Sequence, residues 1–366
     1  MLSKRLMAGI RTGAYCLLGL LLASCRALAE GDLLPSLQMA GGDWPEAVTT
    51  HTFRPVDGSA AELWSISSVY ARHDVAPALD ATDSRIFALA SLTRNQEVSV
   101  HAFDGRSGKL LWSRGPGQWT VLAEEQSLLF VGGVGDVRAL DAATGELRWS
   151  VNLSPARSVT ELALGEAFIN VNTVHQHFFR VAQLNGQILG DWKYDEYSEV
   201  FFEHDGIAYV QPTRLDQLAG IDRDKGTILW QVELGEPYYY GPAITDDSLY
   251  IRSGRSIGPI YRISREGGLL VWRSHDETYI SDFAVEGALG FGLNSAGELH
   301  RFDLDTGEAT VVGRFSPSPL IRQDEDGHPR GYHVAFDREH GLVFAQLGDS
   351  WQLFAIRVDL QGQLSP

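Results

Sequence analysis

Short runs of alternating apolar and polar residues dominate the sequence after about residue 50. Val98–Phe103 and Asp136–Leu140 are examples, and each is followed by a turn of Asp, Asn, Thr or Gly and then by a second apolar run. Alternation with a period of two between such turns predicts antiparallel strands joined by tight hairpins. Helical periodicity longer than three turns is absent beyond the first 30 residues. The pattern therefore predicts an all-β fold.

Five of these turns share a layout in which a tryptophan follows the turn glycine, four residues later in four copies and six in one. The positions are Asp104, Gly108 and Trp112; Asp141, Gly145 and Trp149; Gly186 and Trp192; Asp222, Gly226 and Trp230; and Gly268 and Trp272. The tryptophans are 37, 43, 38 and 42 residues apart, and a period near 40 indicates a repeat architecture. In such a turn the Asp accepts local backbone hydrogen bonds and the Gly supplies a positive φ. The indole has its natural place in the seam between modules.

A second kind of hairpin precedes each of these turns. Seven copies can be aligned, and they end at Phe87, Phe130, Asn170, Tyr209, Tyr250, Phe291 and Phe344. The steps between them are 43, 40, 39, 41, 41 and 53 residues. Two hairpins per repeat give four strands, which is the size of a propeller blade. We expect seven blades, or eight if residues 313–330 contain a degenerate unit.

The two ends of the repeat region indicate how the ring closes. The sixth turn, Asp303–Gly307, is followed by Val311 in place of a tryptophan, and the seventh, Asp359–Gly362, lies too close to the last residue for an outer strand to follow. Near the other end, Trp64 belongs to an orphan half-repeat. We therefore expect the N-terminal strand to complete the last blade, which removes an open sheet edge.

The first 29 residues have the pattern of an export signal. Three basic residues precede an apolar core of about 10 residues, which is too short to span a bilayer. Two cleavage sites remain open, one after Ala29 and one before Cys25, where Leu22–Cys25 resembles a lipobox and Cys25 would be lipidated. We expect a signal peptide over 1–29, an extended segment over 30–56 and the propeller over 57–366.

The net charge argues against nucleic acid as a partner, and the cysteine content argues against thiol chemistry in the folded part. The chain has a net charge of −17, and loss of the four basic residues of the leader leaves 26 basic against 47 acidic residues, or −21. Such a surface repels phosphate backbones, so nucleic acid is not an expected partner. The two cysteines, Cys16 and Cys25, both lie in the leader, so the folded part carries no thiol chemistry.

The module Ala139–Trp149 closely resembles the repeat of pyrroloquinoline-quinone-type β-propellers. The resemblance covers nearly all of the chain after the leader. That family contains quinoprotein dehydrogenases, which resemble this chain less because they are longer, have eight blades and carry a vicinal cysteine pair. It also contains a cofactor-free branch typified by BamB, which scaffolds β-barrel assembly at the outer membrane. This chain resembles that branch in its leader, in its length and in having no recognisable catalytic set. The resemblance implies no cofactor.

Aromatic residues mark the predicted loops that join the outer strand of one blade to the inner strand of the next. These are Tyr70, Trp119, Tyr194, Tyr197, Tyr238, Tyr239, Tyr240, Tyr279 and Tyr332. Tyrosine and tryptophan are favoured at protein interfaces, so they are candidates for an aromatic binding rim. The alternative is that they fill the central channel and pack against loop backbone.

Three polar groups remain as further candidates. Arg252 and Arg255 could receive a carboxylate or could pair with neighbouring acidic residues. His175 and His177 face one side of a strand, but no third metal ligand is near in the sequence. Asp324–Gly327 lacks the remaining positions of a calcium loop, and the surrounding stretch is better described as an insertion between the last two blades.

Together these features predict an exported, non-catalytic propeller that acts as an interaction scaffold in a bacterial envelope. We expect a monomeric ring in the periplasm that binds an envelope protein and contacts a membrane only through an N-terminal lipid. Two alternatives from other classes stay open: a periplasmic sensor that binds a small molecule or quinone, and a quinoprotein dehydrogenase. The sequence does not name the partner, since fold analogy alone does not determine function.

Overall fold

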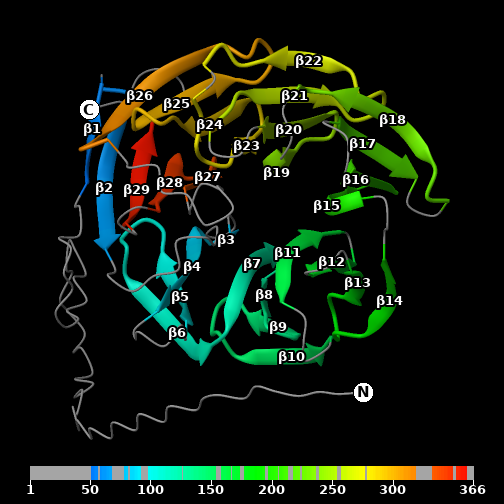
Figure 1. The fold of residues 1–366 in the computed structure, drawn as a ribbon. Coiled ribbons are helices and arrows are strands. Elements are labelled where there is room, and N and C mark those ends of the chain that lie inside the picture. The colour runs from blue at the N-terminus through cyan, green and yellow to red at the C-terminus, as the bar shows by residue number, and fades with distance from the viewer. Residues whose placement is uncertain are drawn as a thin grey trace, which may run out of the picture. The chain divides into compact units, whose positions relative to one another are not determined.

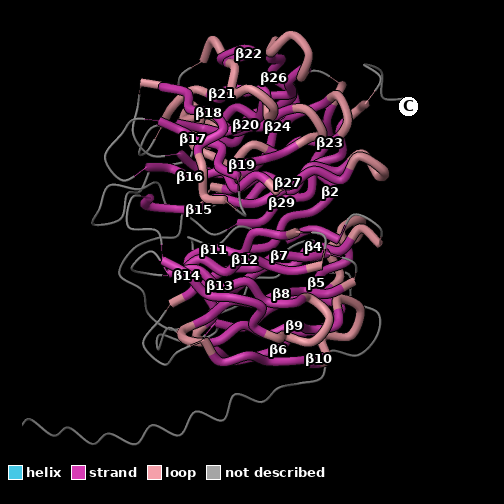
Figure 2. The backbone as a smooth tube through the Cα atoms, turned by 90° about the vertical axis from the view of Figure 1, so that its right-hand side faces the viewer, coloured by secondary structure: helices cyan, strands magenta, loops and turns pink. Residues whose placement is uncertain are grey.

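The computed structural model describes most of the chain beyond residue 50. The described residues are 51–56, 58–67, 78–80, 83–91, 98–125, 127–153, 158–165, 167–173, 177–193, 197–204, 206–212, 217–222, 225–235, 239–253, 257–276, 278–318, 332–348 and 352–360. By its internal contacts the chain divides into residues 1–34 and 35–366, and all described residues belong to the second unit. Their regular structure is entirely β-strand (Figure 2). None of these residues forms a helix that could cross a membrane.

The strands form seven antiparallel sheets arranged around a ring, as the sequence predicts (Figure 1). Five sheets consist of four strands that follow one another along the chain. Blade one contains β3 (Ala78–Asp80), β4 (Arg85–Ser91), β5 (Val98–Asp104) and β6 (Leu110–Gly117); blade two contains β7 (Trp119–Glu125), β8 (Leu128–Gly133), β9 (Asp136–Asp141) and β10 (Leu147–Asn152). Blade three contains β11 (Val159–Leu164), β12 (Phe168–Thr173), β13 (His177–Ala182) and β14 (Ile188–Lys193). Blade four contains β15 (Tyr197–His204), β16 (Ile207–Pro212), β17 (Gln217–Asp222) and β18 (Ile228–Glu233); blade five contains β19 (Tyr239–Ile244), β20 (Ser248–Ser253), β21 (Ile260–Ser264) and β22 (Leu270–Arg273).

The last two blades each take a strand from the start of the chain. Blade six contains β23 (Ala284–Glu286), β24 (Leu289–Leu293), β25 (Glu298–Asp303) and β26 (Ala309–Ser316), and β1 (Thr52–Pro55) adds a fifth strand outside β26. Blade seven contains β27 (His333–Asp337), β28 (Leu342–Leu347) and β29 (Gln352–Val358), and β2 (Ala60–Ser67) is its outer strand. Closure of the ring by the N-terminal strand is therefore confirmed. The extra strand β1 was not predicted, and it places the first strand of the propeller at Thr52 rather than after residue 57.

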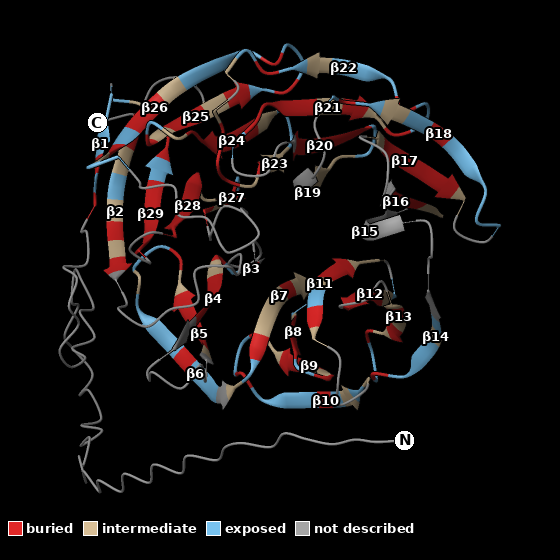
Figure 3. Cartoon of the chain, viewed as in Figure 1, coloured by how far each residue is buried: buried red, intermediate tan, exposed pale blue. Residues whose placement is uncertain are grey.

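Among the described residues, burial is highest in the second strands, such as β8 and β12, is lower in the inner strands β7 and β11, and is lowest in outer strands such as β10 (Figure 3). The apolar clusters lie between neighbouring blades; one of them joins Phe87 and Trp112 of blade one to Trp119 and Leu129 of blade two. Each blade is a sheet with two apolar faces. Both faces must be buried, so each blade is stable only when it packs between two neighbouring blades. The inner strand β27 of blade seven lies beside β3 of blade one, so the layers continue around the ring.

Repeat tryptophans form the outer part of five seams in the described part of the ring. The indole of Trp112 donates a hydrogen bond of 3.0 Å to the carbonyl of Ala142 in the turn of the next blade. The corresponding pairs are Trp64 with Gly105, Trp149 with Gln183, Trp230 with Arg265 and Trp272 with Leu304. The side chain of Trp192 lies outside the described part of the chain. Each indole thus fastens one blade to the next.

The turn glycines leave room for these rings. A Cβ at Gly145, which has a φ of +68°, would lie 2.7 Å from the indole of Trp112. Asp141 organises the same turn, because its Oδ1 accepts hydrogen bonds from the backbone of Ala143 and Thr144. The Asp, Gly and Trp of the repeat therefore serve one contact between neighbouring blades.

Candidate interaction surface

The antiparallel order of the strands divides the connections of the propeller between two faces. The Asp-Gly turns before the outer strands lie on one face, which we call the turn face. The connections from an outer strand to the next inner strand lie on the opposite face, together with the hairpins between second and third strands. This second face, which we call the loop face, carries Gln118 between β6 and β7 and Val134–Gly135 between β8 and β9.

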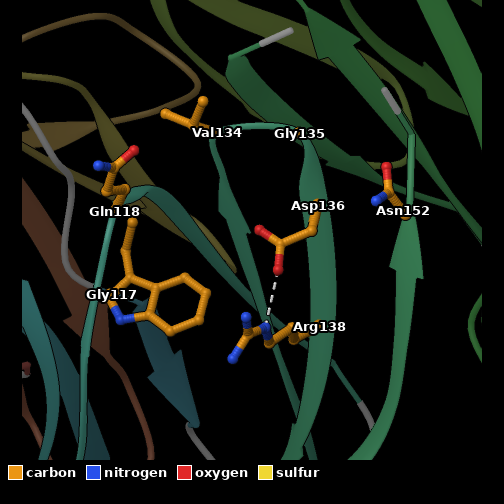
Figure 4. A pocket seen from close by; sticks show the side chains of 8 residues that line it. Gly117, Gln118, Val134, Gly135, Asp136, Arg138 and Asn152 are labelled. Atoms are coloured by element: carbon orange, nitrogen blue, oxygen red, sulfur yellow. Dashed lines mark hydrogen bonds and ion pairs between the residues drawn. The ribbon is translucent and has the colours of Figure 1, made fainter. Parts of the chain in front are cut away.

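A groove of about 470 Å³ opens on the loop face of blade two, at its border with blade one (Figure 4). It is lined by Gly117, Gln118, Trp119, Val134, Gly135, Asp136, Arg138 and Asn152. These residues come from the end of β6, the start of β7, the β8–β9 hairpin, β9 and the end of β10. A volume of this size is typical of a site for a small ligand or a few residues of a peptide.

Trp119 forms one wall of the groove. It pairs with Gly133 of β8, and its ring extends across this glycine to β9, where the guanidinium carbon of Arg138 lies 4.6 Å from the ring centre. A side chain at Gly133 would crowd this corner of the groove, since its Cβ would lie 2.8 Å from the backbone carbonyl of Gln118 and 3.0 Å from Oδ1 of Asp136. A Cβ at Gly117 would lie only 2.2 Å from the same indole. Two glycines therefore make the wall possible.

Arg138 is held from a second side by Asp136. The two residues are neighbours on one side of β9, because alternate residues of a strand face the same way, and Nε of Arg138 donates a hydrogen bond of 2.8 Å to Oδ2 of Asp136. The Arg138 side chain is 41% exposed and that of Asp136 is 23% exposed. The groove thus presents an arginine of fixed orientation to solvent.

A polar network lies on the loop face of blade six. The amide of Asn294 donates hydrogen bonds of 3.0 Å to both Asp276 and Glu298, and the hydroxyl of Tyr279 lies 2.9 Å from Nδ1 of His300. Burial alone would raise the pKa of Glu298, but hydrogen bonds from Asn294, His300 and Arg314 hold it below its ordinary value. These groups satisfy one another and fix the β24–β25 hairpin, so the network has a structural role.

A partly buried charge cluster lies at the start of two inner strands. Asp282, just before β23, forms an ion pair with Nδ1 of His333 at the start of β27. Burial would raise the pKa of Asp282, but the charges of His333 and Arg252 hold it below its ordinary value. The cluster joins blade six to blade seven.

The predicted aromatic and arginine candidates fall into three groups: buried residues, one residue that lines the groove, and residues whose side chains lie outside the described part of the chain. Tyr279, Tyr332 and Arg252 are at most 2% exposed, so their side chains pack in the interior and are not accessible at the surface. Trp119 is also buried, but its ring lines the groove. Tyr70, Tyr194, Tyr238 and Arg255 lie outside the described residues. Tyr197 begins β15, and Tyr239 and Tyr240 begin β19; the side chains of these three also lie outside the described part.

Of the predicted histidine, calcium-loop and lipidation sites, only His177 lies in the described part of the chain. His177 lies 3.1 Å from Asp191 and stacks on Phe179, whereas His175, Asp324–Gly327 and the predicted lipidation site Cys25 lie outside the described residues. In the part of the chain that the structure describes, no group of three or more His, Cys, Asp or Glu side chains is arranged to hold a metal ion.

Sequence reasoning missed Asp136, Arg138 and Asn152. Asp136 and Arg138 stand two apart in a predicted strand, which indicates a shared side, but the sequence carries no signal that Trp119 would reach the same place. Their convergence depends on the pairing of β7 with β8 and of β8 with β9.

Comparisons with known proteins identify one family. The family described as outer membrane protein assembly factor BamB matches residues 96–204 and 192–311. Among solved structures, BamB from Moraxella catarrhalis has 13% sequence identity and a TM-score of 0.49, and the match covers 85% of this chain and 99% of that one. The computationally designed protein Ika8 has 16% identity and a TM-score of 0.55, with 81% and 99% covered, and this similarity concerns the fold alone. A search of curated protein sequences found no match.

Proposed function

The chain belongs to the family of the outer membrane protein assembly factor BamB, and on this premise we propose that it is a non-catalytic scaffold that binds another protein of the bacterial envelope. The expected place is the periplasm, with an N-terminal lipid as the contact to the outer membrane. Family membership supports the class of function. The leader supports the place, because an apolar core of about 10 residues followed by Leu22–Cys25 resembles the signal of a lipoprotein.

The observation that carries the proposal is the groove on the loop face of blade two. It combines a partly exposed arginine, two amide side chains and an exposed valine around a rigid tryptophan. Protein interfaces are enriched in Trp and Arg held in well-packed surroundings. The repeat itself needs none of the exposed groove residues, since its seams are made by the Asp, Gly and Trp of the turns on the opposite face.

The test uses the full-length tagged chain in its own envelope, gently solubilised, with mass spectrometry of co-purified proteins. Two exposed groove residues are replaced together, Gln118→Glu and Val134→Glu. The control is Leu147→Glu, which places a negative charge on an exposed residue of β10 near the turn face; Leu147 is 57% exposed. We expect a stable envelope partner with the wild type and the control, and its loss with the groove variant.

Other results would contradict the proposal in different ways. Recovery of the partner with the groove variant would show that the binding site lies elsewhere on the ring. Recovery of no envelope protein with the wild type would contradict the scaffold function itself. Each variant is first compared with the wild type by circular dichroism and thermal unfolding, so that a loss of binding is not mistaken for a loss of fold.

A further inference from the structure

Arg138 has donor groups that the protein leaves available. Its Nε is engaged by Asp136 and its face lies over Trp119. Within the described residues, the two terminal nitrogens Nη1 and Nη2 make no hydrogen bond to the protein. A guanidinium offers parallel pairs of N–H groups from its side and from its end. Because Asp136 occupies Nε, the pair at the end, formed by Nη1 and Nη2, remains for a ligand.

The orientation of this arginine is fixed before any ligand binds. The ion pair with Asp136 and the contact with Trp119 restrict the side chain from two directions, and Trp119 is itself packed in the core of blades one and two. A side chain that is already ordered loses less conformational entropy on binding. Preorganised arginines of this kind bind planar oxyanions through two parallel hydrogen bonds.

The surroundings of Arg138 favour a singly charged anion over a doubly charged one. Gln118 and Asn152 carry amide donors on opposite sides of the Asp136–Arg138 pair (Figure 4). Asp136 is the one acidic residue among the eight that line the groove. Its charge, and the net charge of −17 of the chain, oppose a dianion such as phosphate more strongly than a carboxylate, because repulsion grows with the charge of the ligand.

An apolar contact lies next to the arginine. Val134 is 43% exposed at the rim of the groove, and the indole of Trp119 forms its wall. A carboxylate attached to a short apolar stretch of chain would therefore find both parts of its binding site in one groove of about 470 Å³.

We propose that this groove recognises a carboxylate group of an extended polypeptide, with Arg138 as the residue that binds it. The proposal rests on the scaffold function above and specifies the chemistry of its partner. Two sources carry this chemistry: the C-terminus of a chain and the side chain of an Asp or Glu. Gln118 and Asn152 add donors to the carboxylate or to the adjacent peptide groups, and Trp119 and Val134 contact the neighbouring side chain.

The experiment titrates the full chain into fluorescein-labelled hexapeptides and follows the fluorescence anisotropy. The peptides are random mixtures of small and apolar residues in three forms. The first has a free C-terminal carboxylate, the second a C-terminal amide, and the third an amide together with one Glu side chain. We expect the first or the third form to bind at least about tenfold more tightly than the second, and which of the two does so identifies the source.

The decisive variant is Arg138→Lys, which keeps the positive charge and loses the two-nitrogen fork. We expect it to weaken binding of the carboxylate peptide by at least about tenfold, while binding of the amide form stays unchanged. Arg148→Lys is the matched control, since Arg148 forms a similar ion pair, of 2.5 Å to Asp141, at an exposed site away from the groove. It should bind like the wild type.

Three results would overturn the inference. These are equal binding of all three peptide forms, unchanged binding by Arg138→Lys, or displacement of the peptide by inorganic phosphate at concentrations where acetate has no effect. If one of them occurs while an envelope partner is still lost from the Gln118→Glu and Val134→Glu variant, the groove is a docking site without carboxylate recognition. If no partner is recovered at all, the scaffold function fails as well.

Discussion

Nε1 of the Trp64 indole donates a hydrogen bond of 2.8 Å to the backbone carbonyl of Gly105. Trp64 lies in β2, the outer strand of blade seven, and Gly105 lies in the turn between β5 and β6 of blade one. The contact therefore joins the last blade of the ring to the first. It repeats the bond that each of the other described repeat tryptophans makes to the next blade, so the ring closes with the same chemistry by which it is built.

Replacing Trp64 should destabilise the closed ring, to a smaller extent with phenylalanine than with alanine. Trp64→Phe removes the hydrogen bond and leaves the Gly105 carbonyl unsatisfied, which should cost about 1–2 kcal/mol of unfolding free energy. Trp64→Ala also removes a ring that is 6% exposed, and a loss of about 3–5 kcal/mol is expected. Urea denaturation followed by circular dichroism measures both. Leu111→Ala, at an exposed position of β6, is the control and should stay within about 0.5 kcal/mol of the wild type. Equal urea midpoints for Trp64→Ala and the wild type would contradict the assignment.

Gly108 should be coupled to Trp64. It has a φ of +71°, and its Cβ as alanine would lie 2.8 Å from the indole. Gly108→Ala should therefore cost about 1 kcal/mol for the backbone conformation and a further amount for the displaced ring. A double-mutant cycle separates the two: in the Trp64→Ala background only the backbone cost should remain. Additive effects of the two substitutions would show that the ring and the turn do not interact.

The fifth strand of blade six should depend on a single missing side chain. A Cβ at Gly313 of β26 would lie 2.0 Å from the ring of Phe53 in β1. Gly313→Ala should therefore displace β1 and expose Phe53, which is 6% exposed in the folded protein. Hydrogen exchange should show faster exchange at Val56, whose N–H donates to the carbonyl of Val312, and at Arg54, which lies two residues earlier on the same edge of β1, while the amides of β24 in the same molecule remain protected. Phe53→Ala should give the same exchange pattern without a clash, and protection of β1 in both variants would disprove its dependence on this contact.

His101 should make the stability of blade one sensitive to acid. Its ring is buried in β5, Nδ1 lies 2.8 Å from Oγ of Ser113, and burial lowers its pKa from 6.5 to about 4. Because the folded pKa is lower than the unfolded one, the unfolded state takes up a proton first as the pH falls. The contribution of neutral His101 is complete above about pH 6.5 and is lost progressively as the pH falls towards about 4, by up to about 3 kcal/mol.

The pH dependence of urea unfolding tests this assignment. His101→Gln, which carries no titrating group, should give a shallower decline of the unfolding free energy between pH 6.5 and 4 than the wild type. His177→Gln is a suitable control, because this histidine is paired with Asp191 near the surface and has a different environment. An unchanged slope in His101→Gln would show that the ring is already protonated, or accessible, in the folded state.

The sequence by itself determined the fold, because the information for a propeller is local and repeated. Asp141, Gly145 and Trp149 lie within nine residues and specify a hairpin and a seam contact before any distant strand is placed. The regular spacing of such units gave the number of blades, and the unpaired Trp64 indicated which strand closes the ring. Each of these conclusions depends on backbone conformation and alternation over short distances, for which elementary rules suffice.

Only the tertiary structure decided which side chains meet across strands and blades. Phe53 packs on Gly313 across 260 positions of sequence, and no local pattern specifies a fifth strand. Tyr279 and Trp119 were equivalent in the sequence as aromatic loop residues, yet Tyr279 turns inward to His300 whereas Trp119 reaches over Gly133 to Arg138. The difference arises from the space that neighbouring strands leave, since a small residue beside one ring opens a path that a larger residue closes.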